Sequence, residues 1–213
     1  MRIDLLKKEW CLAAHPNLFV FTCMGPLALV PAYPLVMIWL FSCLGIFISF
    51  TYNRETNDLY YTALLPIPRQ ALVTSKFLVT ITAQLASLLL TLPFAQLRQA
   101  LPLAGNPVGL SANVTLFTVG FLIFGVFNFT FLPAYFRQPA KVGQAFLKCL
   151  PGLLLVAGGA EALPHFPGYH WLTTFGAEQT KQLPGLLLAL LGYLVATGLA
   201  ARHAHRNFAH VDL

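Results

Sequence analysis

The residues best suited to chemistry or recognition gather in one polar segment, residues 53–76, between two long apolar runs. This segment combines charged and amide side chains with paired prolines, tyrosines and leucines: Glu55, Asn57, Tyr60, Tyr61, Leu64, Leu65, Pro66, Pro68 and Arg69. Tyrosine and arginine are enriched among the residues that anchor protein interfaces. The pattern therefore predicts recognition of a partner protein; the alternative is an amphipathic connector that rests on lipid.

The sequence contains no pattern for catalysis or nucleotide binding. It has no G-x-x-x-x-G-K-[ST] stretch, no G-x-S-x-G and no H-E-x-x-H. His203, His205 and His210 have a weak spacing for a metal, and we interpret them as solvated tail residues. We therefore expect no catalytic residue, no metal and no cofactor in this chain.

Local signals predict a short helix and a rigid bend within residues 53–76. Thr56 or Asn57 is a typical N-cap. A helix that starts there must end before Pro66, because proline disfavours helix in the residue before it, and Pro68 repeats the effect. A second helix is expected to restart after Pro68 and to continue through Lys76 into the next apolar run.

The apolar runs on either side of this segment are too hydrophobic to fold in water. Hydrophobic residues make up 57% of the sequence and charged residues 9%, whereas soluble domains carry about 25% charged residues. A membrane-spanning helix needs about 20 mostly apolar residues, and the uncharged runs supply them. The sequence predicts an all-α integral membrane protein, a single transmembrane domain over residues 1–213, with six spans near 17–31, 34–52, 77–97, 111–134, 143–161 and 184–201.

Lysine and arginine set the expected orientation. If the N-terminus is cytosolic, only Arg98 and Lys181 of the 13 basic residues fall outside the cell. This asymmetry follows the positive-inside rule. We therefore expect a multi-pass protein of the cell membrane with both termini and residues 53–76 in the cytosol. The net charge of +6 reflects this bias and not nucleic-acid binding, since no basic face carries interleaved aromatics.

Residues 1–15 are expected to form an amphipathic helix on the inner leaflet. Ile3, Leu6, Trp10 and Ala13 recur at helical spacing. Such a helix lies in the plane of the interface, and Pro16 then turns the chain into the membrane. A retained signal anchor is the alternative.

A family resemblance rests on the polar segment. The segment resembles the signature of small six-span ABC transporter permeases of the type-two exporter class. The matching residues are Glu55-x-Asn57, then Leu64-Leu65-Pro66-Ile67-Pro68-Arg69, then Val73-x-Ser75-Lys76. Their second cytosolic segment typically reads Leu-x-Ser-Leu-Pro-Val-Ser-Arg, a hydrophobic residue, then Ser-Lys-Tyr. The sequence departs from this pattern at Ala63 and Pro68, where serines are commoner, and at Phe77, which replaces tyrosine.

The resemblance implies a role for each matching residue. In such permeases this segment is the coupling helix, which docks in a groove of a separate ATP-binding subunit. Here the apolar plug would be Tyr60, Tyr61, Leu64 and Leu65, with its angle set by Pro66 and Pro68 and its orientation by Glu55 and Arg69. Asn57 would belong to the same coupling segment. Arg137 and Lys141 in the loop 137–143 would make a second contact, with the ATPase or with anionic lipid.

The same resemblance implies the partners. ATP and Mg²⁺ would be bound by the ATP-binding cassette subunit, and a second copy of this chain or a related permease would complete the pathway. Phe117, Phe121 and Phe124 are hypothesised to line that pathway, which favours a hydrophobic or amphipathic peptide, lipid or drug as cargo. The alternative is that these rings face lipid.

Two other functions stay open from the sequence. The chain could be a non-transporting membrane scaffold or assembly protein that docks a cytosolic partner through residues 53–76. It could also be an ATP-independent channel. This function is disfavoured because we expect the spans to lack a polar stripe. Ion-coupled transport is disfavoured because no charge is expected deep inside a span.

Overall fold

The structure, a computed structural model, describes residues 2–101 and 106–209, and these residues form helices and connecting loops without strands. The α-helices are α1 (Arg2–Lys8), α2 (Pro16–Thr22), α3 (Met37–Glu55), α4 (Asp58–Ala63), α5 (Arg69–Ala100), α6 (Val114–Arg137), α7 (Val142–Ala162) and α8 (Leu183–Ala209). The 3-10 and π segments are η1 (Glu9–Ala13), η2 (Gly25–Leu29), η3 (Pro139–Lys141), η4 (Leu163–His165), η5 (His170–Thr173) and η6 (Gly176–Gln182).

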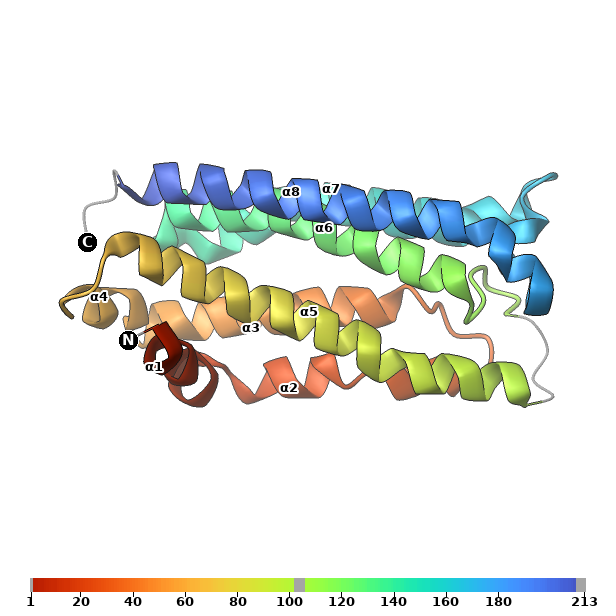
Figure 1. Ribbon diagram of the computed structural model, residues 1–213, viewed down its shortest axis with the longest axis horizontal. Helices are drawn as coiled ribbons and strands as arrows, with labels where there is room; N and C mark the ends of the chain where they lie inside the picture. Colours follow the sequence, from red (N-terminus) through yellow and green to blue (C-terminus); the bar gives the residue numbers. More distant parts are fainter. Residues whose placement is uncertain (1, 102–105, 210–213) are drawn as a thin grey trace.

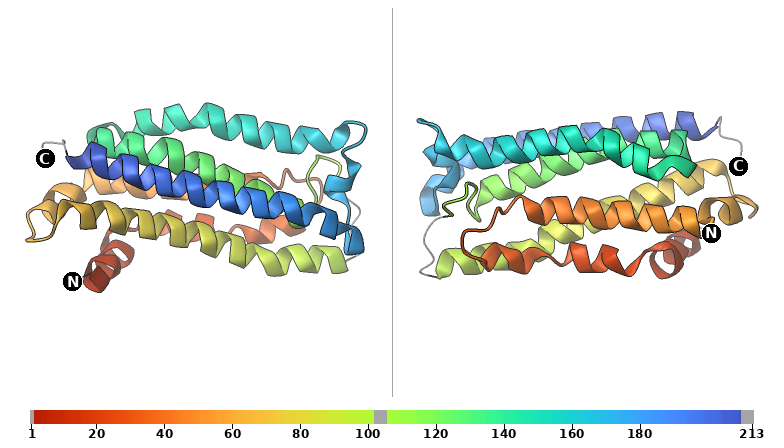
Figure 2. Two further views of the ribbon diagram at one scale, coloured as in Figure 1. Left: turned by 45° about the horizontal axis from the view of Figure 1, so that its top comes forward. Right: turned by 180° about the vertical axis from the view of Figure 1, so that it is seen from behind.

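The long helices lie side by side, and the chain runs back and forth between two ends of the bundle (Figure 1). α4, the start of α5 and the C-terminal ends of α3, α6 and α8 meet at one end, which we call the α4 end. Residues 106–113 and the segments η4 to η6 form the opposite end (Figure 2). α1 lies at the α4 end, across the direction of the long helices.

Length and composition identify the segments able to cross a membrane. Four helical segments of the described chain qualify: Arg69–Ala100, Val114–Arg137, Pro139–His165 and Gly176–Ala209. The pair Leu5–Ala13 and Pro16–Leu29, bent by 91°, makes a fifth if it is counted as one broken span. The protein is therefore an all-helical, multi-pass membrane protein, and the count of six spans stays a prediction.

α3 is not among these segments, although it coincides with the predicted span 34–52. It has 19 residues, or about 28 Å at 1.5 Å per residue. Its last turn contains Asn53, Arg54 and Glu55 and dilutes its apolar content. Helix formation thus continues three residues beyond the predicted end of the span, into the segment expected to form the polar connection.

The span predicted over residues 17–31 is broken in the structure. α2 ends at Thr22, and the chain continues as the short 3-10 segment η2 from Gly25. Gly25 lies directly against α5: a Cβ there would approach the carbonyl oxygen of Leu90 to 2.9 Å. Pro26 follows and has no N–H to donate to a helix. The break lets η2 pack closely on α5.

The interior is filled largely by aromatic rings on α3 and α6. Trp39 is fully buried and donates its indole N–H to the carbonyl oxygen of Leu116, at 3.0 Å. Further along α6, Phe131 and Tyr135 are fully buried and pack edge-to-face on Phe50 of α3. α6 in turn packs most extensively on α8. This core joins the C-terminal ends of α3 and α6 at the α4 end, where α4 packs on α3 and α5.

Candidate docking surface at the α4 end

The segment predicted to recognise a partner folds as expected in outline. α4 covers Asp58–Ala63, and α5 begins directly after Pro68. Asn57 occupies the N-cap position with φ of 53°, a left-handed conformation that asparagine tolerates better than most residues. Its side chain makes no cap hydrogen bond, so its role is to turn the chain sharply out of α3.

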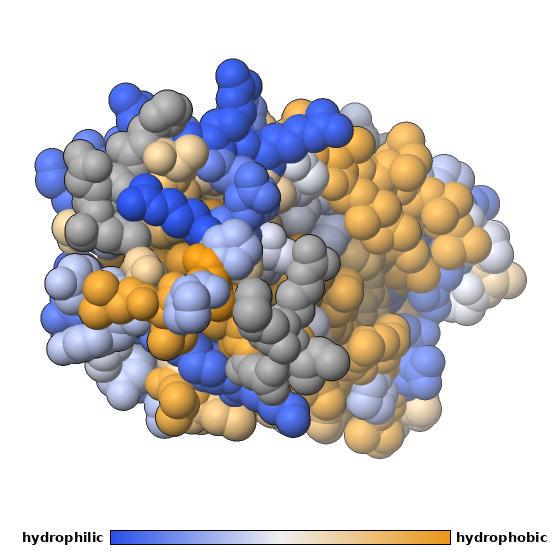
Figure 3. All heavy atoms as spheres, turned by 60° about the vertical axis from the view of Figure 1, so that its left-hand side comes forward, coloured by the Kyte–Doolittle hydropathy of each residue, from blue (hydrophilic) through white to orange (hydrophobic). Residues whose placement is uncertain are grey.

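The outer side of this segment is apolar and exposed. Tyr60, Tyr61, Leu64 and Leu65 have exposed fractions of 49%, 64%, 67% and 52%. We call these four side chains the α4 tip. They stand at the hydrophilic end of the molecule, which Figure 3 contrasts with its hydrophobic flank. Large apolar side chains outside a membrane span mark a contact surface for another molecule.

The residues predicted to set the angle and the orientation of the tip surround it. Pro66 and Pro68 are exposed in the bend between α4 and α5, and Arg69 is exposed at the first position of α5. Glu55 is exposed in the last turn of α3, where its carboxylate lies 3.4 Å from Arg54. The structure therefore brings all nine predicted coupling residues to one end of the bundle.

The inner side of α4 is held by buried charges that the sequence analysis did not identify. Lys76 Nζ lies 2.6 Å from Glu9 Oε2 and 2.7 Å from Asp58 Oδ2. Lys8 pairs with the same two acids, at 3.2 Å from Glu9 Oε1 and in direct contact with Asp58. We call these four residues the ion cluster. It alternates two acids and two bases, and therefore carries no net charge.

The ion cluster joins three elements: the α1–η1 pair, α4 and α5. Glu9 and Lys76 are each only 2% exposed, and Lys8 Nζ also donates to Thr62 Oγ1 at 2.8 Å. Removing charges from water costs several kcal/mol per ion, so such a group persists only when each charge is paired and hydrogen-bonded. The cluster therefore fixes the position of α4 relative to α1 and α5.

The pKa of Asp58 shows which influence dominates at this carboxylate. Burial raises its pKa, but the ammonium groups of Lys76 and Lys8 lower it by more, so the net pKa lies below its usual value. Asp58 is therefore ionised at neutral pH. Its carboxylate therefore pairs with the ammonium groups of Lys76 and Lys8.

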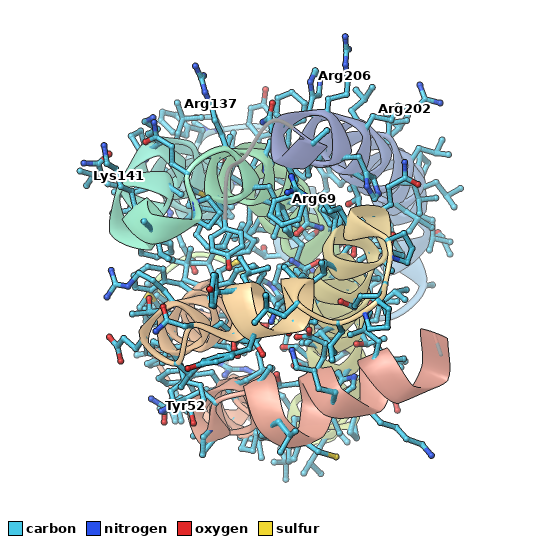
Figure 4. The ribbon with its side chains drawn as sticks, turned by 90° about the vertical axis from the view of Figure 1, so that its left-hand side faces the viewer. Tyr52, Arg69, Arg137, Lys141, Arg202 and Arg206 are labelled. Carbon is cyan, nitrogen blue, oxygen red and sulfur yellow. The ribbon has the colours of Figure 1, made fainter. Side chains whose placement is uncertain are left out.

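The second predicted contact lies beside the first. Arg137 ends α6 and Lys141 ends η3, and both point outward at the α4 end together with Arg202 and Arg206 (Figure 4). A cleft of about 150 Å³ separates α4 from η3, with Tyr60 on one side and Pro139 on the other. The two predicted contacts therefore lie at the same end of the bundle, with this cleft between α4 and η3.

A polar stripe along α5 was also missed. The expectation that the spans lack such a stripe is wrong: one buried face of α5 carries Lys76, Thr80, Gln84, Ser87, Thr91 and Arg98. Steps of three and four residues place them on one side of the helix. A hydropathy average over all faces of α5 hides these polar residues. Their spacing of three and four residues in the sequence could have revealed them.

At mid-length of α5 the stripe forms a neutral network that joins three helices. Gln84 and Asn128 of α6 exchange two hydrogen bonds, of 2.8 and 3.0 Å, between their side-chain amides. Asn128 also donates to Thr197 Oγ1 of α8, and Tyr193 of α8 donates its hydroxyl to Gln84 Oε1, both at 3.0 Å. We call these four residues the amide network. Its four side chains hydrogen-bond to one another, and these bonds join α5, α6 and α8.

The phenylalanines predicted to line a pathway occupy different environments. Phe124 is fully buried and packs edge-to-face on Trp39, with ring centroids 5.8 Å apart. Phe117 also packs on Trp39, and Phe121 packs on Tyr193; both are partly buried. Phe124 is thus a core residue within this chain, and the lining role of the three residues stays a prediction.

Within the described residues, no group of three His, Cys, Asp or Glu side chains comes close enough to hold a metal ion. His203 and His205 are in the last turns of α8. The third histidine of the tail, His210, lies outside the described residues.

Comparison with known proteins gives one match. Residues 4–202 match the family model described as ABC-2 family transporter protein. The matched range contains α4, the ion cluster and the amide network, and it leaves out little of the chain. No curated protein and no solved structure matches the chain.

Proposed function

The chain belongs to the ABC-2 family of transporter proteins, and from this membership we propose that it is the membrane-spanning permease subunit of an ATP-driven exporter. The chain contains no phosphate-binding loop. In the proposal ATP and Mg²⁺ are therefore bound by a separate ATP-binding cassette subunit. This chain contributes the pathway and the surface that receives the motion.

The proposed topology has six crossings, with α2–η2, α3, α5, α6, α7 and α8 each passing between the two ends of the bundle. The α4 end faces the cytosol, and both termini lie on that side of the cell membrane. Support comes from the clustering of Arg69, Arg137, Lys141, Arg202 and Arg206 at this end (Figure 4). Basic residues are retained on the cytosolic side of membrane proteins.

The α4 tip is proposed to dock on the ATP-binding subunit, with Arg137 and Lys141 as a second contact. The single observation that carries this proposal is the contrast between the two sides of α4. Its outer side exposes the α4 tip, while its inner side is fixed by the ion cluster. A surface built this way transmits displacement, because its contact residues are free to bind and its base is rigid.

Transport then follows from a change in the partner. When ATP closes the pair of ATP-binding subunits, each moves the α4 tip seated in it. The ion cluster carries the displacement to α5 and to the α1–η1 pair, and the amide network passes it to α6 and α8. The energy comes from the different affinities of the two states for ATP, since this chain performs no chemistry.

The pathway is proposed to form between two permeases, either two copies of this chain or this chain and a related one. Phe117, Phe121 and Phe124 on α6 give that region an apolar character. We therefore propose a hydrophobic or amphipathic cargo: a peptide, a lipid or a drug. A transport assay that showed preference for a small hydrophilic solute would contradict this part of the proposal.

The docking role is tested by co-expressing the chain with an ATP-binding cassette subunit and measuring co-purification and ATP turnover. Leu64→Asp with Leu65→Asp should weaken association at least about tenfold, because two buried apolar contacts become charged. Both side chains are exposed in this chain, so membrane insertion should be unchanged. Phe166→Asp with Tyr169→Asp is the matched control, since these exposed aromatics lie at the opposite end.

Three results would count against the proposal in different ways. Association that survives the double leucine variant would remove the α4 tip as the docking surface. Equal loss in the control variant would point to a general defect of the membrane protein. Co-purification without any change in ATP turnover would favour the scaffold function over transport.

A further inference from the structure

A groove on the side of the bundle is not part of the α4 tip. It has a volume of about 370 Å³ and is lined by residues of α1, the first turns of α5 and the end of α8. α1 and α8 lie on either side of the start of α5 when the molecule is seen from the α4 end (Figure 4). We call this the α1–α8 groove. Its volume is within the range of sites that bind small molecules.

The groove changes from polar to apolar along α5. Gln70 and Thr74 line it near the α4 end, and Leu78 lines it one turn further along. On the same face of α5 follow Leu85 and Leu89, which are exposed on the flank of the bundle. Hydroxyl and amide groups therefore lie at the level of the α4 end, and aliphatic side chains continue from them along the helix.

α1 adds an apolar wall to this groove. Leu5 and Leu6 line it opposite α5. The first apolar turns of an interfacial helix lie at the boundary of headgroups and acyl chains. Leu5 and Leu6 therefore close the groove on the side of α1 with apolar side chains. On the side of the bundle flank, the groove continues toward the exposed Leu85 and Leu89 of α5.

The charged residues beside the groove on α8 are basic, although none of them is among its lining residues. His205 of α8 lines the groove, and in the described chain no hydrogen-bond partner reaches the buried Nδ1 atom of its ring. Arg202 and Arg206 flank His205 in the sequence and point outward at the α4 end. No acidic residue is among the described residues that line the groove, and the nearby Glu9 and Asp58 are paired with lysines in the ion cluster.

We propose that the α1–α8 groove binds an anionic phospholipid of the surrounding leaflet. The phosphate lies near Gln70, Thr74 and His205, with Arg202 and Arg206 supplying the charge that favours an acidic headgroup. One acyl chain follows Leu78 and then the exposed leucines of α5. The order of polar, basic and aliphatic groups matches the order of the parts of a phospholipid, whereas a cytosolic peptide has no long apolar tail for this face.

The proposal is tested by purifying the full chain in detergent with equal amounts of phosphatidylglycerol and phosphatidylcholine. Native mass spectrometry then counts the lipids that stay bound. The unaltered chain should retain phosphatidylglycerol preferentially. Arg202→Gln with Arg206→Gln should lower its retention about tenfold relative to phosphatidylcholine. Arg54→Gln with Lys148→Gln is the charge-matched control, because these residues belong to α3 and α7, which contribute no residue to the groove, whereas Arg202 and Arg206 are neighbours of His205 on α8.

A second variant tests the groove itself without changing its charge. Thr74→Phe fills the space beside Leu78 and should also reduce phosphatidylglycerol retention. Thr180→Phe places the same ring at an exposed position of η6, at the opposite end of the bundle, and should not. Equal losses in the two charge variants would overturn the proposal, because phosphatidylglycerol would then be attracted to basic residues in general. Full retention in Thr74→Phe would also overturn it, because the lipid would then not occupy the groove.

Discussion

The ion cluster and the amide network both join α5 to neighbouring elements, but they do so with different chemistry. At the α4 end, Glu9, Asp58, Lys8 and Lys76 are charged and pair with one another. At mid-length of α5, Gln84 and Asn128 are neutral and exchange two hydrogen bonds. Glu9 and Lys76 are as buried as the amide network, whereas Lys8 and Asp58 keep 22% and 12% of their side chains exposed.

The difference follows from the cost of charge at each depth. A charged side chain at the centre of a membrane is expensive, whereas one near the interface can be solvated while the helices assemble. Neutral amides satisfy both of their hydrogen-bonding groups without that cost. In the proposed mechanism, charge thus fixes α4, which receives the force from the partner, and weaker neutral bonds join the helices that are proposed to move relative to one another.

The largest effect is expected from breaking the ion cluster. Lys76→Met leaves Glu9, which is 2% exposed, with only Lys8 as its partner. An uncompensated buried charge typically lowers the free energy of unfolding by about 3–5 kcal/mol. Denaturant unfolding of the purified chain in detergent micelles measures this loss.

Two controls sharpen the result. Lys148→Met replaces an exposed lysine and should change the free energy of unfolding little. Lys76→Met combined with Glu9→Gln removes both charges and should recover much of the loss, because no carboxylate is then left unpaired. If Lys76→Met were no worse than Lys148→Met, the cluster would not stabilise the position of α4.

A smaller effect is expected from the amide network. Asn128→Leu removes its bonds to Gln84 and Thr197. Hydrogen bonds between membrane helices contribute about 0.6 kcal/mol on average and up to about 1.7 kcal/mol. For three bonds, the same unfolding experiment should therefore show a loss of about 2 kcal/mol, below the loss of about 3–5 kcal/mol expected for Lys76→Met.

The control for this variant is another residue of α6. Thr118 donates its hydroxyl only to the carbonyl oxygen of Val114 within its own helix, at 3.1 Å, so Thr118→Val should cost less than Asn128→Leu. A loss from Asn128→Leu as large as that from Lys76→Met would contradict the expected difference in stability between the two groups. The central network would then be as strong a clamp as the charged one.

The sequence predicts the surface of the α4 end better than what lies beneath it. Pro66 and Pro68 act on their own neighbours, so the short helix, the bend and the restart of α5 are local properties. The ion cluster is not local, because it requires Glu9 of the N-terminal segment to reach Lys76. Nothing near either residue indicates that α1 turns back onto α5.

The same limit applies inside the bundle. Gln84 and Asn128 are 44 residues apart, and their pairing depends on how α5 and α6 are packed. The spacing from Thr80 to Thr91 nevertheless indicated a polar face on α5. The break at Gly25 has a local part, because Pro26 cannot donate a helical hydrogen bond. The close approach of Gly25 to α5 depends on packing and was harder to foresee.

The smallest effect is expected from acid, and it separates the two regions by chemistry. Because the pKa of Asp58 is lowered in the folded chain, its contribution to stability is complete above the ordinary aspartate pKa of about 3.9 and is lost as the pH falls through the lower folded value. Burial opposes the two lysines, so the loss is modest. Unfolding measured from pH 6 down to pH 3 should show it in the unaltered chain and in Asn128→Leu. Asp58→Asn should flatten this part of the curve, and an unchanged acid response in that variant would mean that the lowered pKa does not contribute to the stability of the α4 end.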